Sequence, residues 1–133
     1  MYLFDTFDGM PATDLTKDEH RAGDLSDTTM ERVSDLLEPC DDVVLKQGLF
    51  PDSAKGLEDE RFSFVHVDVD IYQSVLHACD WFYPRLVPGG AMLFDDYGFL
   101  SCPGALQAVD EFCSREDIAK LYLGTGQALI WKQ

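Results

Sequence analysis

The sequence has little positive charge. Only 10 of its 133 residues are lysine or arginine, against 25 aspartates and glutamates, and the net charge is −15. Because nucleic acids and anionic membranes are bound through basic surfaces, this composition argues against both as partners. Long apolar runs are also missing, since no stretch approaches the roughly 18 residues that span a bilayer. Residues 1–5 lack the basic and apolar regions of a signal peptide, so we expect a cytoplasmic protein.

Cysteine and histidine are scarce. The four cysteines are widely spaced, and no two are separated by only two residues. Neither they nor the three histidines have the spacing of a typical zinc site. Cys79 and Cys113 fall on apolar helix faces, where cysteine behaves as a small hydrophobic residue, so we expect reduced, buried thiols rather than disulfides. His66 lies within an apolar strand, and we expect it in the core or an interface.

The sequence does have the material for a folded core, with 46% hydrophobic and 12% aromatic residues. Segments of strand character alternate with segments of helical periodicity, and no repeat or linker interrupts residues 1–133. The expected strands are 2–4, 43–46, 62–68, 91–94, 120–123 and 127–131, and the expected helices are 27–38, 54–59, 71–86 and one containing 105–113. This alternation indicates a single α/β domain with a mostly parallel sheet.

Two segments differ from this pattern. Residues 5–25 form a long, polar, turn-rich loop, and loops of that length in compact domains are commonly lids or binding loops. The last two strands are joined by Gly124-Thr125-Gly126, which is typical of a hairpin. We expect this hairpin to add an antiparallel strand at one edge of the sheet.

Three of the expected strands end in an aspartate, namely Asp5, Asp68 and Asp95. Asp96 doubles the third, and Asp70 follows Asp68 by two residues. Parallel strands place their carboxyl ends at one edge of the sheet, where open α/β folds bind ligands. Carboxylates that lie close together repel unless a proton or a cation neutralises them, and oxygen ligands suit Mg²⁺. The alternative is that these aspartates cap the helices that follow.

Several blocks of the sequence resemble one enzyme family. The most specific are FVHVDVDIYQS at 64–74, FYPRLVPGG at 82–90 and FDDYG at 94–98. Further blocks agree in the same order, at 3–11, 48–53, 101–105, 108–112 and 126–130. Together they resemble the macrocin O-methyltransferase family, whose members transfer a methyl group from S-adenosylmethionine to a sugar hydroxyl of macrolide and related antibiotics. The resemblance implies a Rossmann-like class I methyltransferase fold and a glycoside or sugar as acceptor.

The resemblance also implies a metal site. In this family a carboxylate after the fourth strand and a pair after the fifth hold Mg²⁺, and Asp68, Asp95 and Asp96 occupy those positions. A sugar hydroxyl is a poor nucleophile until it loses its proton, and coordination to a divalent cation lowers its pKa. Asp68 is the candidate general base that takes this proton.

A cofactor site is implied by the same resemblance. The carboxylate after the family's second strand binds the ribose hydroxyls of S-adenosylmethionine, and Asp5 matches it. One carboxylate can accept hydrogen bonds from both hydroxyls of a ribose. Asp70 and Tyr72 follow the first acidic position and are expected to contribute to the cofactor site.

The family pattern includes a strand, a glycine-rich turn and helices ahead of the block at residues 3–11. The sequence starts at the block of the second strand, so we expect residues 1–133 to be a partial methyltransferase domain. The first strand of the family lies at the centre of the sheet, between the second and the fourth. We therefore expect a gap, re-paired strands or a strand borrowed from another chain, which a homo-oligomer would allow. We also expect weak binding of S-adenosylmethionine and no turnover by this chain alone.

Two other functions compete with this interpretation. One is a catalytically inactive, methyltransferase-like remnant that binds a metal or a partner. The other is a Mg²⁺-dependent phosphohydrolase of the haloacid dehalogenase type, which also has an Asp-x-Asp after a strand. That type requires a Thr or Val where Tyr72 stands, and a lysine at a strand end between the two acidic motifs, which this sequence lacks. The sequence does not identify the acceptor sugar.

Overall fold

The strands form two separate sheets in a computed structural model that describes all 133 residues. In the first sheet, β1 (Tyr2–Asp5) and β2 (Val44–Gln47) pair in parallel. The second sheet has the order β3-β4-β6-β5, with the bounds Phe62–Val67, Leu86–Phe94, Ala128–Trp131 and Lys120–Tyr122. β3 and β4 are parallel, whereas β6 is antiparallel to both β4 and β5. The expected α/β class is confirmed, but the second sheet is mixed and not mostly parallel.

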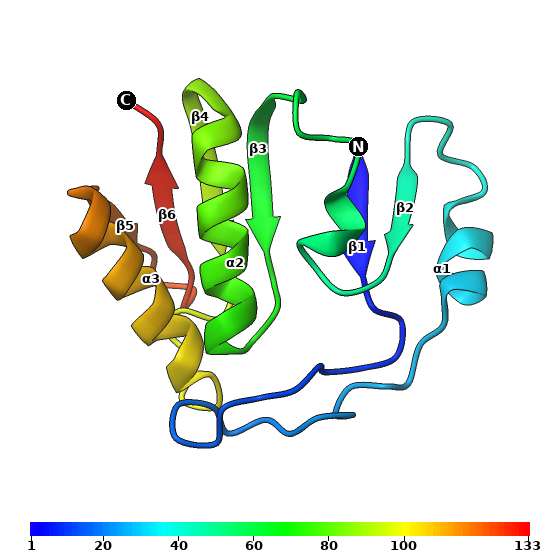
Figure 1. The fold of residues 1–133 in the computed structure, drawn as a ribbon, viewed down its shortest axis with the longest axis horizontal. Coiled ribbons are helices and arrows are strands. Elements are labelled where there is room, and N and C mark those ends of the chain that lie inside the picture. Colours follow the sequence, from blue (N-terminus) through cyan, green and yellow to red (C-terminus); the bar gives the residue numbers. More distant parts are fainter.

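Three α-helices and two short 3₁₀ turns connect the strands. They are α1 (Met30–Leu37), α2 (Tyr72–Phe82), α3 (Pro103–Glu116), η1 (Asp52–Ala54) and η2 (Tyr83–Arg85). α2 and α3 lie side by side on one face of the second sheet (Figure 1). None of the three α-helices combines the length and the hydrophobicity that a membrane span requires.

Three of the four expected helices are shorter than the sequence predicts, and α3 is the exception. α1 begins after Thr29, whose side chain accepts the N–H of Arg32, and not after Ser26. α2 ends at Phe82 because Pro84 lies in the next turn and cannot continue the helical hydrogen bonds. The helix expected over 54–59 is only the single turn η1.

The strand β4 is longer than the predicted strand 91–94, because residues 87–90 also belong to it. They stay paired with the end of the chain. The N–H of Gly89 donates to the carbonyl of Lys132 at 2.9 Å, and the N–H of Lys132 donates to the carbonyl of Gly90 at 2.8 Å. Gly89 has φ +78°, a conformation that glycine adopts without a steric penalty.

No strand lies between β1 and β3, so the gap that the resemblance allows is what the structure shows (Figure 1). Aromatic rings join the two sheets in place of backbone hydrogen bonds. The ring of Phe82 lies 5.8 Å from that of Phe4 and 5.2 Å from that of Phe62, centroid to centroid. Phe50 stacks on Phe82 at 5.2 Å. Phe82, at the end of α2, therefore packs against side chains from both sheets.

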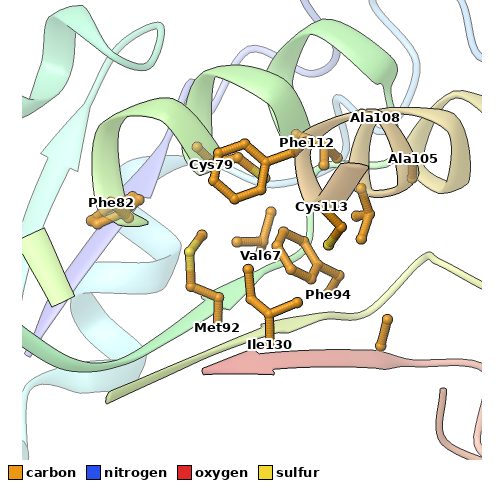
Figure 2. Close-up of a cluster of buried hydrophobic side chains, with 14 of the residues drawn as sticks. Val67, Cys79, Phe82, Met92, Phe94, Ala105, Ala108, Phe112, Cys113 and Ile130 are labelled. Atoms are coloured by element: carbon orange, nitrogen blue, oxygen red, sulfur yellow. The ribbon is translucent and has the colours of Figure 1, made fainter. Parts of the chain in front are cut away.

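The main core lies between the second sheet and the two helices. Phe94, Met92 and Ile130 point from the sheet toward Cys79 and Phe112 of the helices (Figure 2). All four cysteines are free, as expected, and all but Cys40 are buried. The opposite face of the sheet is more open, since Phe64 is 57% exposed.

We expect Phe82→Ala to destabilise the chain by about 3–5 kcal/mol, because it removes a buried ring that touches both sheets. Urea unfolding should show the loss as a lower midpoint. Phe64→Ala is the matched control, since that ring is largely exposed and should cost less than about 1 kcal/mol. Equal losses in the two variants would contradict the bridging role of Phe82.

Candidate functional site

Acidic side chains gather at the carboxyl ends of β3 and β4. The parallel register pairs Val67 with Phe94, the last residue of each strand. The N–H of Asp95 continues the ladder by donating to the carbonyl of Val67 at 2.9 Å. Asp68 and the pair Asp95-Asp96 therefore leave neighbouring strands at the same edge of the sheet.

The carboxylates that come closest together are those of Asp68, Asp70 and Asp96. One oxygen from each lies within 4.8 Å of the others. The backbone N–H of Asp70 donates to Oδ2 of Asp96 at 3.0 Å, and Asp70 adopts a left-handed conformation with φ +57°. No lysine or arginine forms an ion pair with any of the three. Only histidines are near enough to offset the repulsion: His20 lies 3.9 Å from Asp70, and His66 lowers the pKa of Asp68.

This arrangement favours the protonated carboxyl in the metal-free chain. Burial, followed by the charge of Asp70, raises the pKa of Asp96 to about 6, although the N–H of Asp70 acts in the opposite direction. Burial also raises the pKa of Asp68, with further increases from Asp95 and Asp70. A proton or a divalent cation can relieve this repulsion, and a cation does so while leaving all the carboxylates ionised.

Asp95 has different partners. Its Oδ1 accepts a hydrogen bond from Nε2 of Gln127 at 2.5 Å and lies 3.4 Å from Nε2 of His66. His66 does not lie in the core, one of the two locations expected for it, because its side chain is 45% exposed on the open face of the sheet. The sequence missed Gln127, which comes from the hairpin and reaches the site only because β6 pairs with β4.

Asp5 lies at the carboxyl end of β1, outside the cluster of three. Its Oδ1 accepts the N–H of Phe7 at 2.6 Å. An open pocket of about 540 Å³ lies beside it, where the loops after β1 and β2 meet, and its lining includes Thr6, Gly9 and Gln47. This position, beyond the carboxyl ends of two parallel strands, is where open α/β sheets bind ligands.

Tyr72 is engaged in packing. Its hydroxyl donates to Oε2 of Glu111 at 2.7 Å, and the Nζ of Lys17 lies 3.3 Å from the centre of its ring. Only 7% of the residue is exposed. Asp70 lies within the carboxylate cluster, whereas Tyr72 begins α2 and contacts α3 and the long loop.

The loop after β1 is held across the acidic edge by Asp18, which no sequence pattern singled out. In Figure 1 this loop runs from β1 along the carboxyl ends of the strands to the starts of α2 and α3. Oδ1 of Asp18 accepts the N–H of Tyr72 at 2.8 Å and so supplies the cap that Ile71 cannot. Gly104 leaves room for it, since a Cβ there would lie 1.9 Å from Oδ1 of Asp18.

Residues 1–131 match the family described as macrocin O-methyltransferase, TylF. The chain belongs to this family. The family predicted from the sequence blocks is thereby confirmed. Within it, the chain is 29% identical over 117 residues to the 8-demethyl-8-(2,3-dimethoxy-alpha-L-rhamnosyl)-tetracenomycin-C 4'-O-methyltransferase of Streptomyces olivaceus. It is 30% identical over 134 residues to the mycinamicin III 3''-O-methyltransferase of Micromonospora griseorubida.

Both relatives are longer than this macrocin-family chain. The matches cover 80% and 90% of the chain but only 45% and 51% of the relatives, so the chain spans about half of their length. The solved O-methyltransferase NovP superimposes with a TM-score of 0.84 at 22% identity, covering 99% of this chain and 59% of NovP. The calicheamicin methyltransferase CalS11 does so with a TM-score of 0.81 at 18% identity. These two structures show that the fold is shared.

We expect Asp18→Ala to lower the free energy of unfolding by about 0.5–2 kcal/mol, the usual effect of losing a helix cap. Without this anchor the loop over 6–29 should also be cut faster by a protease. Asp8→Ala is the control, because Asp8 lies in the same loop, is exposed and caps no helix. Equal proteolysis of the two variants would show that Asp18 does not hold the loop.

Asp96 should make the metal-free chain less stable as the pH rises. The pKa of Asp96 is about 6 in the folded chain and near 4 when unfolded, so the folded state binds the proton more tightly. Stability is therefore lost between about pH 4 and pH 6, by on the order of 1–3 kcal/mol.

In the presence of a chelator, Asp96→Asn should become more stable relative to wild type across this window. Urea unfolding at several pH values measures the difference, with the exposed Asp41→Asn as control. A constant difference between wild type and Asp96→Asn would contradict the raised pKa.

Proposed function

We propose that this chain is part of a divalent-metal-dependent O-methyltransferase that uses S-adenosylmethionine and acts on a sugar hydroxyl of a natural product. The observation that carries the proposal is the carboxylate cluster after β3 and β4, in a chain of the macrocin O-methyltransferase family. The names of the relatives support the class of acceptor, since one is named for a rhamnosyl-tetracenomycin and another for mycinamicin III.

The residues fit a hard cation such as Mg²⁺. Asp68, Asp95 and Asp96 offer only carboxylate oxygens, the ligand type that Mg²⁺ prefers. Asp95 lies close enough to Asp68 to raise its pKa, and only its Oδ1 is engaged by His66 and Gln127. We assign these three aspartates as the ligands. Asp70 lies beside them and adds negative charge.

When bound, the cation supplies a positive charge that lowers the pKa of a coordinated sugar hydroxyl. Asp68 is the proposed base that accepts the hydroxyl proton, because burial and the charges of Asp95 and Asp70 raise its pKa. The carboxylates also hold the acceptor in place. Such positioning matters because transfer of a methyl group requires the attacking oxygen, the methyl carbon and the sulfur to lie in line.

Asp5 is the proposed contact to the ribose of S-adenosylmethionine. Its Oδ1 is occupied by the N–H of Phe7, and its Oδ2 is available to accept a ribose hydroxyl. The pocket beside Asp5, between the loops after β1 and β2, has room for the part of the ligand next to the ribose. Asp70 and Tyr72 are the proposed cofactor residues at the start of α2. For Tyr72 this proposal rests on the resemblance alone, because its hydroxyl is bound to Glu111, its N–H to Asp18, and its ring lies against Lys17.

The gap between β1 and β3 fits a partial methyltransferase domain. We propose that a further strand, followed by a glycine-rich turn, belongs in this gap and holds the methionine part of the cofactor. If the turn contributes three backbone hydrogen bonds of about 1 kcal/mol each, their loss weakens the binding of S-adenosylmethionine by a factor on the order of a hundred. The chain without such a segment is therefore expected to bind S-adenosylmethionine weakly and to show no turnover.

The metal site can be tested by thermal unfolding of the 133-residue chain. Mg²⁺ or Mn²⁺ should raise the melting temperature, since a ligand that binds only the folded state stabilises it. Asp95→Asn should reduce the shift, because a neutral amide attracts a hard cation less, and Asp41→Asn should leave it unchanged. The same shift in Asp95→Asn and wild type would reject the assignment of Asp95.

The methyl transfer requires a second measurement on the same chain. Calorimetric titration should detect weak or no binding of S-adenosylmethionine, and micromolar binding would contradict the need for a further strand. Labelled methyl transfer to a rhamnosyl glycoside should then appear when a polypeptide with the strand and glycine-rich turn of a relative is added. Absence of transfer despite restored cofactor binding would favour the alternative of an inactive, metal-binding remnant.

A further inference from the structure

A second group of metal-ligand atoms lies on the other side of Asp70. It consists of His20 from the long loop, Asp70 after β3, and Cys102 just before α3. The Sγ of Cys102 lies 3.4 Å from Oδ1 of Asp70 and 3.8 Å from Nε2 of His20. The Nε2 of His20 lies 3.9 Å from the same Oδ1. Neither His20 nor Cys102 has a part in the methyl transfer proposed above.

The triangle formed by these three atoms has the size of a metal coordination face. A point equidistant from all three lies about 2.1 Å from each, given the three separations. Zinc is bound at about 2.0–2.1 Å by histidine, about 2.0–2.2 Å by a carboxylate and about 2.3 Å by a thiolate. An ion slightly above the plane of the triangle can therefore reach all three donors without a change in the backbone.

The chemistry of the three donors separates this site from the carboxylate cluster. One nitrogen, one sulfur and one oxygen suit Zn²⁺ and related transition metals, whereas Mg²⁺ prefers oxygen alone. When the ion binds, the thiol of Cys102 releases its proton to solvent and the sulfur forms the bond to the metal. Three protein ligands also leave a fourth position of a tetrahedral ion for water.

The site is reachable from solvent on one side. The side chains of His20 and Asp70 are 23% and 19% exposed, while Cys102 lies beneath them at 3%. The three ligands come from segments that are distant in the sequence, and Asp18, two residues before His20, already anchors the loop to α2. A bound ion would therefore add a second attachment of the loop to the edge of the sheet.

We propose that His20, Asp70 and Cys102 form a second metal site that binds Zn²⁺. The ion would attach the loop over 6–29 to the segment after β3 and to the start of α3. His20 and Cys102 take no part in the proposed methyl transfer, whereas Asp70 is also proposed above to contribute to the cofactor site. It shares no ligand with the proposed Mg²⁺ site of Asp68, Asp95 and Asp96, although Asp70 lies beside that site.

Co²⁺ is the probe for this site, because a bond from cobalt to a thiolate gives an intense near-ultraviolet charge-transfer absorption. The full chain is freed of metal with a chelator, transferred to excess Mg²⁺ to occupy the proposed site of Asp68, Asp95 and Asp96, and titrated with Co²⁺. The absorption should saturate at one equivalent, and Zn²⁺ should displace the cobalt and abolish it. No thiolate absorption in the wild-type chain would overturn the proposal.

Variants assign the ligands. Cys102→Ser should abolish the absorption, and Cys40→Ser, which changes the exposed cysteine, should leave it intact. Because Cys102 is buried and its serine variant can fail to fold, His20→Gln in the loop provides a second test. It should weaken Co²⁺ binding more than tenfold, since even outer partners of metal ligands contribute that much. An absorption that persists in a folded Cys102→Ser chain, or unchanged affinity in His20→Gln, would overturn the site.

Discussion

The parallel pairing of β3 with β4 is the interaction on which the acidic edge depends. It sets Val67 beside Phe94, and every carboxylate of the cluster follows from that register. A shift by one residue would turn the side chains of one strand to the opposite face of the sheet. The buried residues Val65, Val67, Met92 and Phe94 prevent such a shift, because they must face α2 and α3. The packing of the core thus fixes the position of polar groups that take no part in it.

The helix α2 connects this edge to the rest of the molecule at both of its ends. Its first N–H group is capped by Asp18, which is 54 residues away in the sequence. Its last residue, Phe82, packs between the two sheets. The order of the long loop, the cap of the helix and the contact between the sheets are therefore coupled through one short element.

Much of the edge was predictable from the sequence alone. Strands that end in Asp5, Asp68 and Asp95 could be located because apolar runs stop at each acidic residue, and parallel order then places their ends together. The proximity of Asp70 to Asp96 was harder to predict from the sequence, since it depends on a left-handed backbone conformation at Asp70. The engagement of Gln127 with Asp95 depends on the pairing of the hairpin with β4.

The Asp18 cap and the group of His20 and Cys102 could not be predicted from the sequence. Both depend on contacts between side chains of residues that are distant in the sequence. Nothing in the sequence of the polar loop distinguishes Asp18 from its acidic neighbours. Its role depends on the hydrogen bond from the N–H of Tyr72 and on the space left by Gly104. The spacing of His20 and Cys102 resembles no zinc motif, because spacing rules describe ligands on one or two local turns. The strand character of residues 87–90 was hidden by proline and glycine, which are typical of turns.

The unpaired edges of β1 and β3 also bear on how copies of this chain meet one another. Each edge presents N–H and C=O groups that can pair with a strand of another molecule, a common route to self-association. The net charge of −15 opposes that encounter over a distance that depends on salt. At an ionic strength of 0.1 M the repulsion extends only about 10 Å. Pairing between the strand edges of two copies is therefore least favoured in dilute buffer, and it becomes more favourable as the salt concentration rises.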